Sequence, residues 1–188
     1  MGSQSSRHWL SARPPWVGRT FSTQVLKVTL TRNFVDDEHM CRWLTDNGAT
    51  ADICGKLDVT PLSVALRRSS MSTIKLLLER CCGVQGGQLL HFAVDRDKED
   101  VLEVIELLCN LGCAIDGIMF WNDQQLMLLG ETGPPLLTAV QLGKADIVAY
   151  LLRRGADPTI LSSKGRTPLQ VAEANGDPSI ISLLKQRG

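Results

Sequence analysis

The sequence predicts an all-α solenoid of about five stacked helix-turn-helix units. Three observations support this fold class. Residues 133–188 contain two similar segments, because Leu136 and Leu169, like Ala139 and Ala172, are 33 residues apart (169 − 136 and 172 − 139 both give 33). Hydrophobic residues make up 44% of the chain and aromatic residues only 5%, as expected for thin helical layers filled by Leu, Ala and Val. Apolar residues also recur at helical spacing, at Ile147, Val148, Leu151 and Leu152.

Start and stop signals divide these segments into helices. Thr167 is placed to cap a helix that begins at Pro168, where the missing N–H group costs nothing. Gly143 and Gly176 stand where the chain must turn from one helix into the next, and a residue free to adopt positive φ suits that turn. Gly155 follows the second helix in the position that ends many helices. Each unit is therefore expected to be an inner and an outer helix joined by a tight turn.

These residues resemble the ankyrin repeat. Residues 165–172 (GRTPLQVA) come close to that family's G-x-TPLHxA opening, and residues 151–158 (LLRRGADP) match the end of its second helix. The resemblance covers roughly residues 22–188, strongly in the second half and weakly before Lys56. It implies helix pairs joined by projecting loops, here called fingers. It also implies a concave face of inner helices and finger tips that contacts other proteins.

The domain organisation follows from composition and period. Residues 1–21, rich in Ser, Arg and Pro, are expected to be an irregular N-terminal extension. Two other interpretations stay open for them: N-myristoylation at Gly2, and an organelle presequence, which Pro14-Pro15 disfavours. The remaining chain is predicted to form one ankyrin-repeat domain, 22–188, with repeats at 22–55, 56–86, 87–132, 133–164 and 165–188.

The repeat pattern is weaker in the first unit than in the second. The first has no Thr-Pro-Leu opening, and its helices are expected over residues 25–30 and 40–44, so it suits an atypical N-terminal cap. The second opens at residues 60–65 and continues with an outer helix around residues 74–78. Ala65 and Ala93 are only 28 residues apart (93 − 65), so the finger between these units should be short.

The third unit is the least regular. It opens at residues 88–93, and the resemblance implies that His91 bonds neighbouring backbone and bridges repeats. A charged turn follows at residues 95–100. Residues 115–133 are then an enlarged finger with an apolar run at 119–121, similar to fingers of fungal multi-repeat ankyrin proteins. Either structural elaboration or contact with a partner would explain so long a connection.

Charge and cysteine content narrow the function classes. The chain carries 20 acidic and 20 basic residues, which argues against nucleic acid or an anionic membrane as partner. It has no apolar run of about 18 residues, so no transmembrane segment is expected. The six cysteines lack the spacing of a secreted disulfide framework and read as reduced thiols in a cytoplasmic or nuclear protein.

No pattern in the sequence predicts catalysis. G-x-S-x-G, H-E-x-x-H and G-x-x-x-x-G-K-[ST] motifs are absent. Cys109 and Cys113 are four residues apart, but no CxxC pair accompanies them to complete a zinc site. We therefore expect no enzyme, no cofactor and no bound metal.

The concave face and fingers are the predicted functional surface of a non-catalytic adaptor that binds another protein. The resemblance assigns the candidate contacts to Arg67, Arg68, Asp95, Arg96, Gln141, Leu142, Ala174 and Asn175 on the inner helices and to Lys56, Trp121, Asp123, Lys164 and Arg166 on the fingers. Arg67, Arg68 and Arg96 predict a partner with acidic contacts, because arginine pairs bidentately with carboxylates. Two alternatives stay open: an enzyme or small-ligand binder with the 115–133 finger as a lid, and a structural subunit that associates through repeat ends near Ile180, Ile181 and Leu184.

Overall fold

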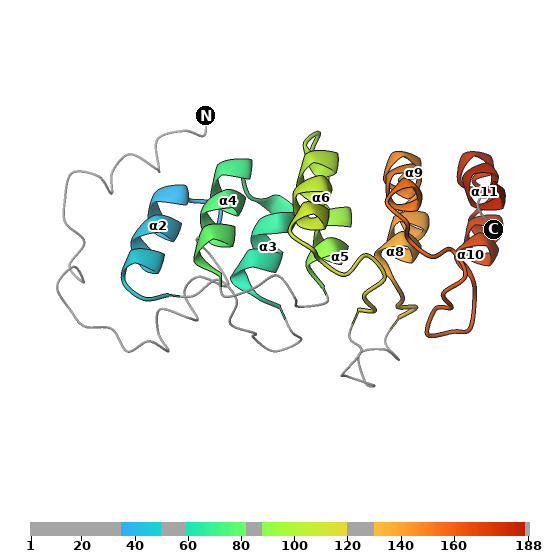
Figure 1. Ribbon diagram of the computed structural model, residues 1–188, viewed down its shortest axis with the longest axis horizontal. Helices are drawn as coiled ribbons and strands as arrows, with labels where there is room; N and C mark the ends of the chain where they lie inside the picture. Colours follow the sequence, from blue (N-terminus) through green and yellow to red (C-terminus); the bar gives the residue numbers. More distant parts are fainter. Residues whose placement is uncertain (1–34, 50–58, 82–87, 120–129, 187–188) are drawn as a thin grey trace, which may run out of the picture.

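The computed structural model describes residues 35–49, 59–81, 88–119 and 130–186. These residues form nine α-helices and no β-strand, as the predicted all-α solenoid requires (Figure 1). The helices are α2 (Glu38–Asp46), α3 (Pro61–Arg68), α4 (Met71–Arg80), α5 (Leu89–Val94), α6 (Val101–Asn110), α8 (Pro135–Gln141), α9 (Ala145–Arg153), α10 (Pro168–Asn175) and α11 (Pro178–Lys185). The inner helix expected over residues 25–30 lies outside the described residues.

The helices stack in two rows. The inner helices α3, α5, α8 and α10 pack on one another in sequence order, and each packs on its own outer helix, α4, α6, α9 or α11. Helix α2 packs on α4 at one end of the outer row. Figure 1 shows the pairs side by side along the long axis, with the connection between α9 and α10 projecting to one side. One helix pair could not bury its apolar face alone, so the stacking itself creates the core.

The local signals in the sequence have the predicted structural effect. Thr167 caps α10, whose first residue is Pro168, and exchanges hydrogen bonds with Gln170 in a capping box. Gly143 and Gly176 adopt φ values of 68° and 74° at the inter-helix turns, a conformation that residues with a Cβ atom rarely adopt.

The core runs along the whole described array. The predicted apolar face of α9 is buried, with Ile147, Val148, Leu151 and Leu152 at most 5% exposed. Ile180 and Leu184 of α11 are also buried, at 0% and 2% exposure. Ile181, the third residue expected at the repeat end, is half-buried, so two of the three side chains do not supply the exposed apolar surface that association through repeat ends would need.

Neighbouring units are joined by what we call inter-unit caps, polar side chains of one unit that donate to backbone carbonyls of the preceding unit. Helix ends leave such carbonyl groups without partners inside the helix. The donors lie at or near the turn between inner and outer helix, and this position brings them against the end of the preceding inner helix or its turn. The caps run from Ser69 to Val35, from Arg96 to Leu66 and Ser69, from Lys98 to Ser69, from Lys144 to Val94 and Arg96, and from Asn175 to Val140.

Candidate partner-binding surface

A row of side chains, all exposed except the half-buried Asp95, marks the C-terminal ends of the inner helices. We call it the inner-helix row. Its members occupy the last helical residues or the residue that follows, and they repeat from unit to unit because the helix pairs are stacked in register. They are Arg67 and Arg68 of α3, Asp95 after α5, Gln141 and Leu142 at the end of α8, and Ala174 and Asn175 of α10.

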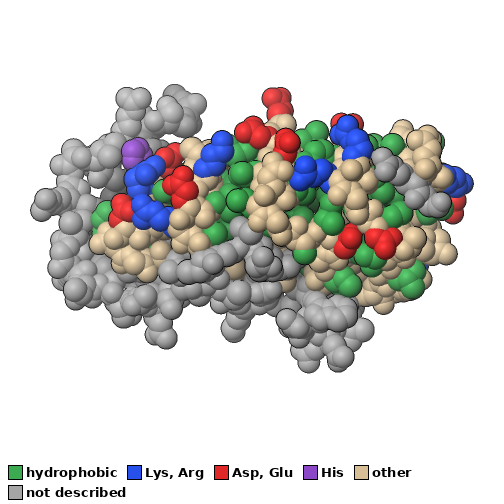
Figure 2. All heavy atoms as spheres, in the orientation of Figure 1, with side chains coloured by type: hydrophobic (Ala, Val, Ile, Leu, Met, Phe, Trp, Pro, Cys, Tyr) green, Lys and Arg blue, Asp and Glu red, His purple; other side chains and the backbone are tan. Residues whose placement is uncertain are grey.

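The arginines of the row are paired with carboxylates of the same chain. Arg67 Nε lies 2.7 Å from Asp95 Oδ2, and Arg68 Nε lies 3.3 Å from Asp36 Oδ2. All four side chains are at least 35% exposed, so water competes with both pairs and each is weak. Figure 2 shows basic and acidic side chains interspersed on the face in view. The row therefore presents both charges, and the arginines from which the sequence predicted acidic partner contacts already have acidic neighbours in the chain.

Arg96 was expected on this surface, and that expectation was wrong. Its side chain is fully buried, and its guanidinium donates to the carbonyl oxygens of Leu66 and Ser69 at 3.1 and 2.8 Å. It also forms a bidentate pair with Asp100 at 2.6 and 2.7 Å. Arg96 thus reaches back under the preceding unit as an inter-unit cap, and a partner could not contact it. The hydrogen bonds from Arg96 also hold the pKa of Asp100 below its usual value.

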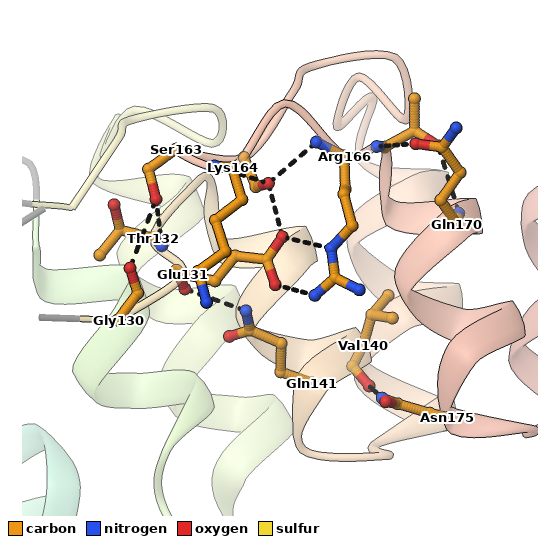
Figure 3. Close-up of polar contacts among 12 residues, drawn as sticks. Gly130, Glu131, Thr132, Val140, Gln141, Ser163, Lys164, Arg166, Gln170 and Asn175 are labelled. Atoms are coloured by element: carbon orange, nitrogen blue, oxygen red, sulfur yellow. Dashed lines mark hydrogen bonds and ion pairs between the residues drawn. The ribbon is translucent and has the colours of Figure 1, made fainter. Parts of the chain in front are cut away.

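The fingers of the third and fourth units meet through a polar network centred on Glu131 (Figure 3). Arg166 donates from Nε to Glu131 Oε1 at 2.9 Å and from Nη2 to Oε2, and the Ser162 hydroxyl donates to Oε1 at 2.6 Å. Gln141 Nε2 donates to the Glu131 carbonyl oxygen at 3.0 Å, which ties this network to the inner-helix row. The Glu131 side chain is only 8% exposed.

Backbone contacts reinforce the network. Ser163 N donates to Thr132 O at 2.8 Å, and Thr132 N donates to Ser163 Oγ at 3.0 Å. Met119 N donates to Gly133 O at 3.4 Å, which brings the two described ends of the third unit's finger together. Residues 130–133 and 162–166 therefore form one connected surface, which we call the finger ledge.

The other predicted finger residues divide into two groups. Lys164 is exposed on the finger ledge, and Arg166 is 42% exposed there. Lys56, Trp121 and Asp123 lie outside the described residues. Glu131 was missed, because its role depends on a partner 35 positions away and no sequence motif marks it.

His91 occupies the structural position that the resemblance implied. Its side chain is buried, and Nε2 lies 2.9 Å from the carbonyl oxygen of Gly133, in the next unit. This contact bridges the third and fourth repeats and lies apart from the exposed row.

The described residues contain neither a group that could bind a metal ion nor a helix that could span a membrane. Within residues 35–49, 59–81, 88–119 and 130–186, no group of three or more His, Cys, Asp or Glu side chains could hold a metal ion. Burial raises the pKa of Cys41 and of Cys113 to about 11, so neither thiol is readily ionised near neutral pH. No helix in the described part of the chain is long and apolar enough to span a bilayer.

Glu131 makes a testable contribution to acid stability. The hydrogen bonds from Arg166, opposed by burial, lower its pKa below the ordinary value of 4.5. The folded state then holds a proton less tightly than the unfolded state. The stabilisation is therefore complete above pH 4.5 and is lost as pH falls through the folded pKa. We expect Glu131→Gln to be less stable than the parent at neutral pH and to lose less further stability below pH 4.5.

Thermal unfolding at neutral pH and at several lower values would measure this difference. Glu103→Gln is a suitable control, because that side chain is 63% exposed and its ion pair with Lys75 is long, at 3.9 Å. Equal acid losses in the parent and in Glu131→Gln would contradict the assigned role of the carboxylate.

Comparison with known proteins agrees with this architecture. Residues 134–163, which comprise α8, α9 and the first part of the following finger, match the family model described as ankyrin repeat. A stretch of 45 residues is 44% identical to the tRNA endonuclease vms1 of Schizosaccharomyces pombe. This stretch covers 24% of the present chain and 8% of that relative, so the likeness concerns a small part of the relative. The chain therefore contains an ankyrin repeat, and its described residues fold as an all-α ankyrin-repeat solenoid.

Proposed function

We propose that this protein is a non-catalytic adaptor that binds another protein through its concave face and finger loops. The observation that carries the proposal is the inner-helix row, in which α3, α8 and α10 end with exposed side chains at equivalent positions and α5 is followed there by the half-buried Asp95. The row contains charged, amide and apolar groups, including Leu142, which is 44% exposed. A mixture of this kind suits a protein partner better than a single small molecule.

The scaffold behind the row supports the same proposal. Arg96 and Lys144 hold adjacent units together through buried or half-buried hydrogen bonds, so the row lies on a pre-organised support. Binding to such a support loses less conformational entropy than binding to a mobile surface. The partner is expected to carry acidic contacts, because Arg67 and Arg68 are exposed enough to exchange their internal carboxylates for those of a partner. The described cysteines of this protein pack as apolar residues, which favours the cytoplasm or the nucleus as the compartment of the protein.

The test is affinity capture from an extract of the cells that produce the protein, with identification by mass spectrometry. The variant Arg67→Gln/Leu142→Ser removes a charge and an apolar side chain from the row. We expect the parent to capture a specific protein and this variant to lose it, since interface contacts near the centre of a surface contribute most to binding.

A closely matched control variant is Arg80→Gln/Leu111→Ser on the outer helices. Arg80 is the last residue of α4 and Arg67 the next to last of α3, and both arginines lie 2.7 Å from a carboxylate oxygen. Leu111 and Leu142 both follow directly after a helix, and they are 45% and 44% exposed. If the control loses the same protein, or if the row variant retains it, the proposed concave-face function is wrong.

A further inference from the structure

We propose that Lys164 and Arg166 on the finger ledge form the carboxylate-recognition site of this protein and bind an acidic side chain of an extended partner segment. This inference rests on the proposed function, and it names the chemistry of one contact. It also moves acidic recognition away from Arg96, which is buried, to the finger of the fourth unit.

The inference starts from the unequal burial of the charges on the ledge. Glu131 is 8% exposed, whereas Arg166 is 42% exposed and Lys164 is also on the surface. Arg166 thus covers Glu131, the acidic residue of this group. A partner that approaches the ledge meets two cationic side chains, although the formal sum of the three charges is only +1.

The same comparison separates Arg166 from the other candidate arginines. The carboxylates that pair with Arg67 and Arg68 belong to Asp95 and Asp36, which are 35% and 56% exposed. An acidic partner must first displace those carboxylates, because they lie on the surface beside the arginines. At Arg166 the internal carboxylate is only 8% exposed and already accepts hydrogen bonds from the arginine, so a partner can approach the guanidinium without displacing it.

Arg166 is also oriented for recognition. Its Nε and Nη2 groups bind the two oxygens of Glu131, which fixes the plane of the guanidinium. A guanidinium carries five N–H donors in a rigid fork, so the Nη1 edge still has donors to offer. Figure 3 shows this edge directed away from Glu131, on the side of α8 and α10. A fixed donor edge loses little conformational entropy when it binds a carboxylate.

The ledge adjoins the inner-helix row. Gln141 donates to the Glu131 carbonyl oxygen, and Asn175 of the next unit donates to Val140 at 3.4 Å. Figure 3 shows both amide side chains on the same side of the finger as the Arg166 guanidinium. A segment that crosses the row between α8 and α10 could therefore place one acidic side chain on Lys164 and Arg166.

The test uses the full chain and a random peptide library displayed on phage. Selected peptides are synthesised in two forms, one with the selected Asp and Glu residues and one with Asn and Gln in their place. Binding to each form is measured by fluorescence anisotropy for the parent and for Lys164→Gln. It is also measured for the double variant Glu131→Gln/Arg166→Gln, which removes the buried charge together with its partner and so leaves neither unpaired. Arg153→Gln, on outer helix α9 of the same unit, is the control.

We expect the library to yield acidic peptides and the parent to bind them at least about tenfold more tightly than their amide forms, as charge-assisted hydrogen bonds predict. The preference should fall in Lys164→Gln, fall further in the double variant, which loses the guanidinium, and persist in Arg153→Gln. Circular dichroism checks that each variant is folded.

Three results would overturn the inference: equal binding of both peptide forms by the parent, an undiminished acid preference in the folded double variant, or a library that yields no binder. None of them decides the proposed function, which the capture experiment with Arg67→Gln/Leu142→Ser judges separately. A protein captured there without any acid preference would leave the adaptor function standing and remove Lys164 and Arg166 from it.

Discussion

Replacing Arg96 with methionine is expected to lower the free energy of unfolding by about 3 kcal/mol, the range found when one partner of a buried ion pair is removed. The arginine side chain is fully buried and satisfies the carbonyl oxygens of Leu66 and Ser69 as well as Asp100. Methionine fills a similar length of the cavity but donates nothing. The carbonyl oxygen of Leu66 would then lose the donor that Arg96 supplies, and Ser69 O would keep only Lys98 Nζ, at 3.2 Å. The half-buried carboxylate of Asp100 would lose both of its hydrogen bonds from Arg96, and leaving buried acceptors without donors accounts for most of the expected loss.

Urea denaturation followed by far-UV circular dichroism measures this loss. The control is Arg67→Met, which removes the same chemical group from an exposed pair with Asp95 and should change stability by less than about 1 kcal/mol. The two arginines lie in adjacent units and looked equivalent as surface candidates. Similar losses in the two variants would show that burial does not separate their roles.

Lys144→Met should have the second largest effect, a loss of about 2 kcal/mol, because a charged donor to two backbone carbonyls is removed. Its ammonium group donates to Val94 O and Arg96 O, both at 3.0 Å, and to Asp97 Oδ1 at 2.9 Å. The side chain is 23% exposed, so these bonds are partly shielded from water. They join the third unit to the fourth, and in a repeat array such contacts form the nearest-neighbour term that makes unfolding cooperative.

The expected signature of Lys144→Met is therefore a broader urea transition, with amides of α5 and α6 exchanging earlier than those of α10. Hydrogen exchange read by mass spectrometry localises this change. Lys185→Met is the control, because its pair with Glu173 at 3.2 Å lies within the last unit and is 58% exposed on the lysine side. If both lysine variants keep one sharp transition, the inter-unit cap at Lys144 does not couple the repeats.

A double-mutant cycle would join the two predictions. Lys144 donates to the carbonyl oxygen of Arg96, so the two caps share a short stretch of backbone. Residues that share a network do not contribute independently. The combined variant should therefore lose less stability than the sum of the separate losses.

The parts of the fold that local chemistry determines could be predicted from the sequence. Thr167 and Pro168 together form a local signal for the start of a helix. Gly143 marks a tight turn, because few residues other than glycine adopt its positive φ. The period of 33 residues then places these signals in successive layers (169 − 136 gives 33). Such features need only a few neighbouring residues to be recognised.

The roles of Arg96 and Glu131 could not be predicted in the same way. Arg96 contacts Leu66, 30 positions earlier, and Glu131 contacts Arg166, 35 positions later. Whether each charge points outward or under a neighbouring unit depends on how closely the units stack, and no local pattern encodes that spacing. A residue carried over by position from a family can thus be buried, as Arg96 is.

The inter-unit caps also give the array a direction during synthesis. Every cap described above runs from a later unit to an earlier one, as from Lys144 to Val94 and from Asn175 to Val140. A ribosome releases the earlier unit first, with the carbonyl groups at its inner-helix end still bound to water. Each helix pair becomes complete only when its successor has left the exit tunnel. Folding on the ribosome should consequently lag one repeat behind translation, and a pause in translation would leave the newest unit, rather than the whole domain, open to chaperones and proteases.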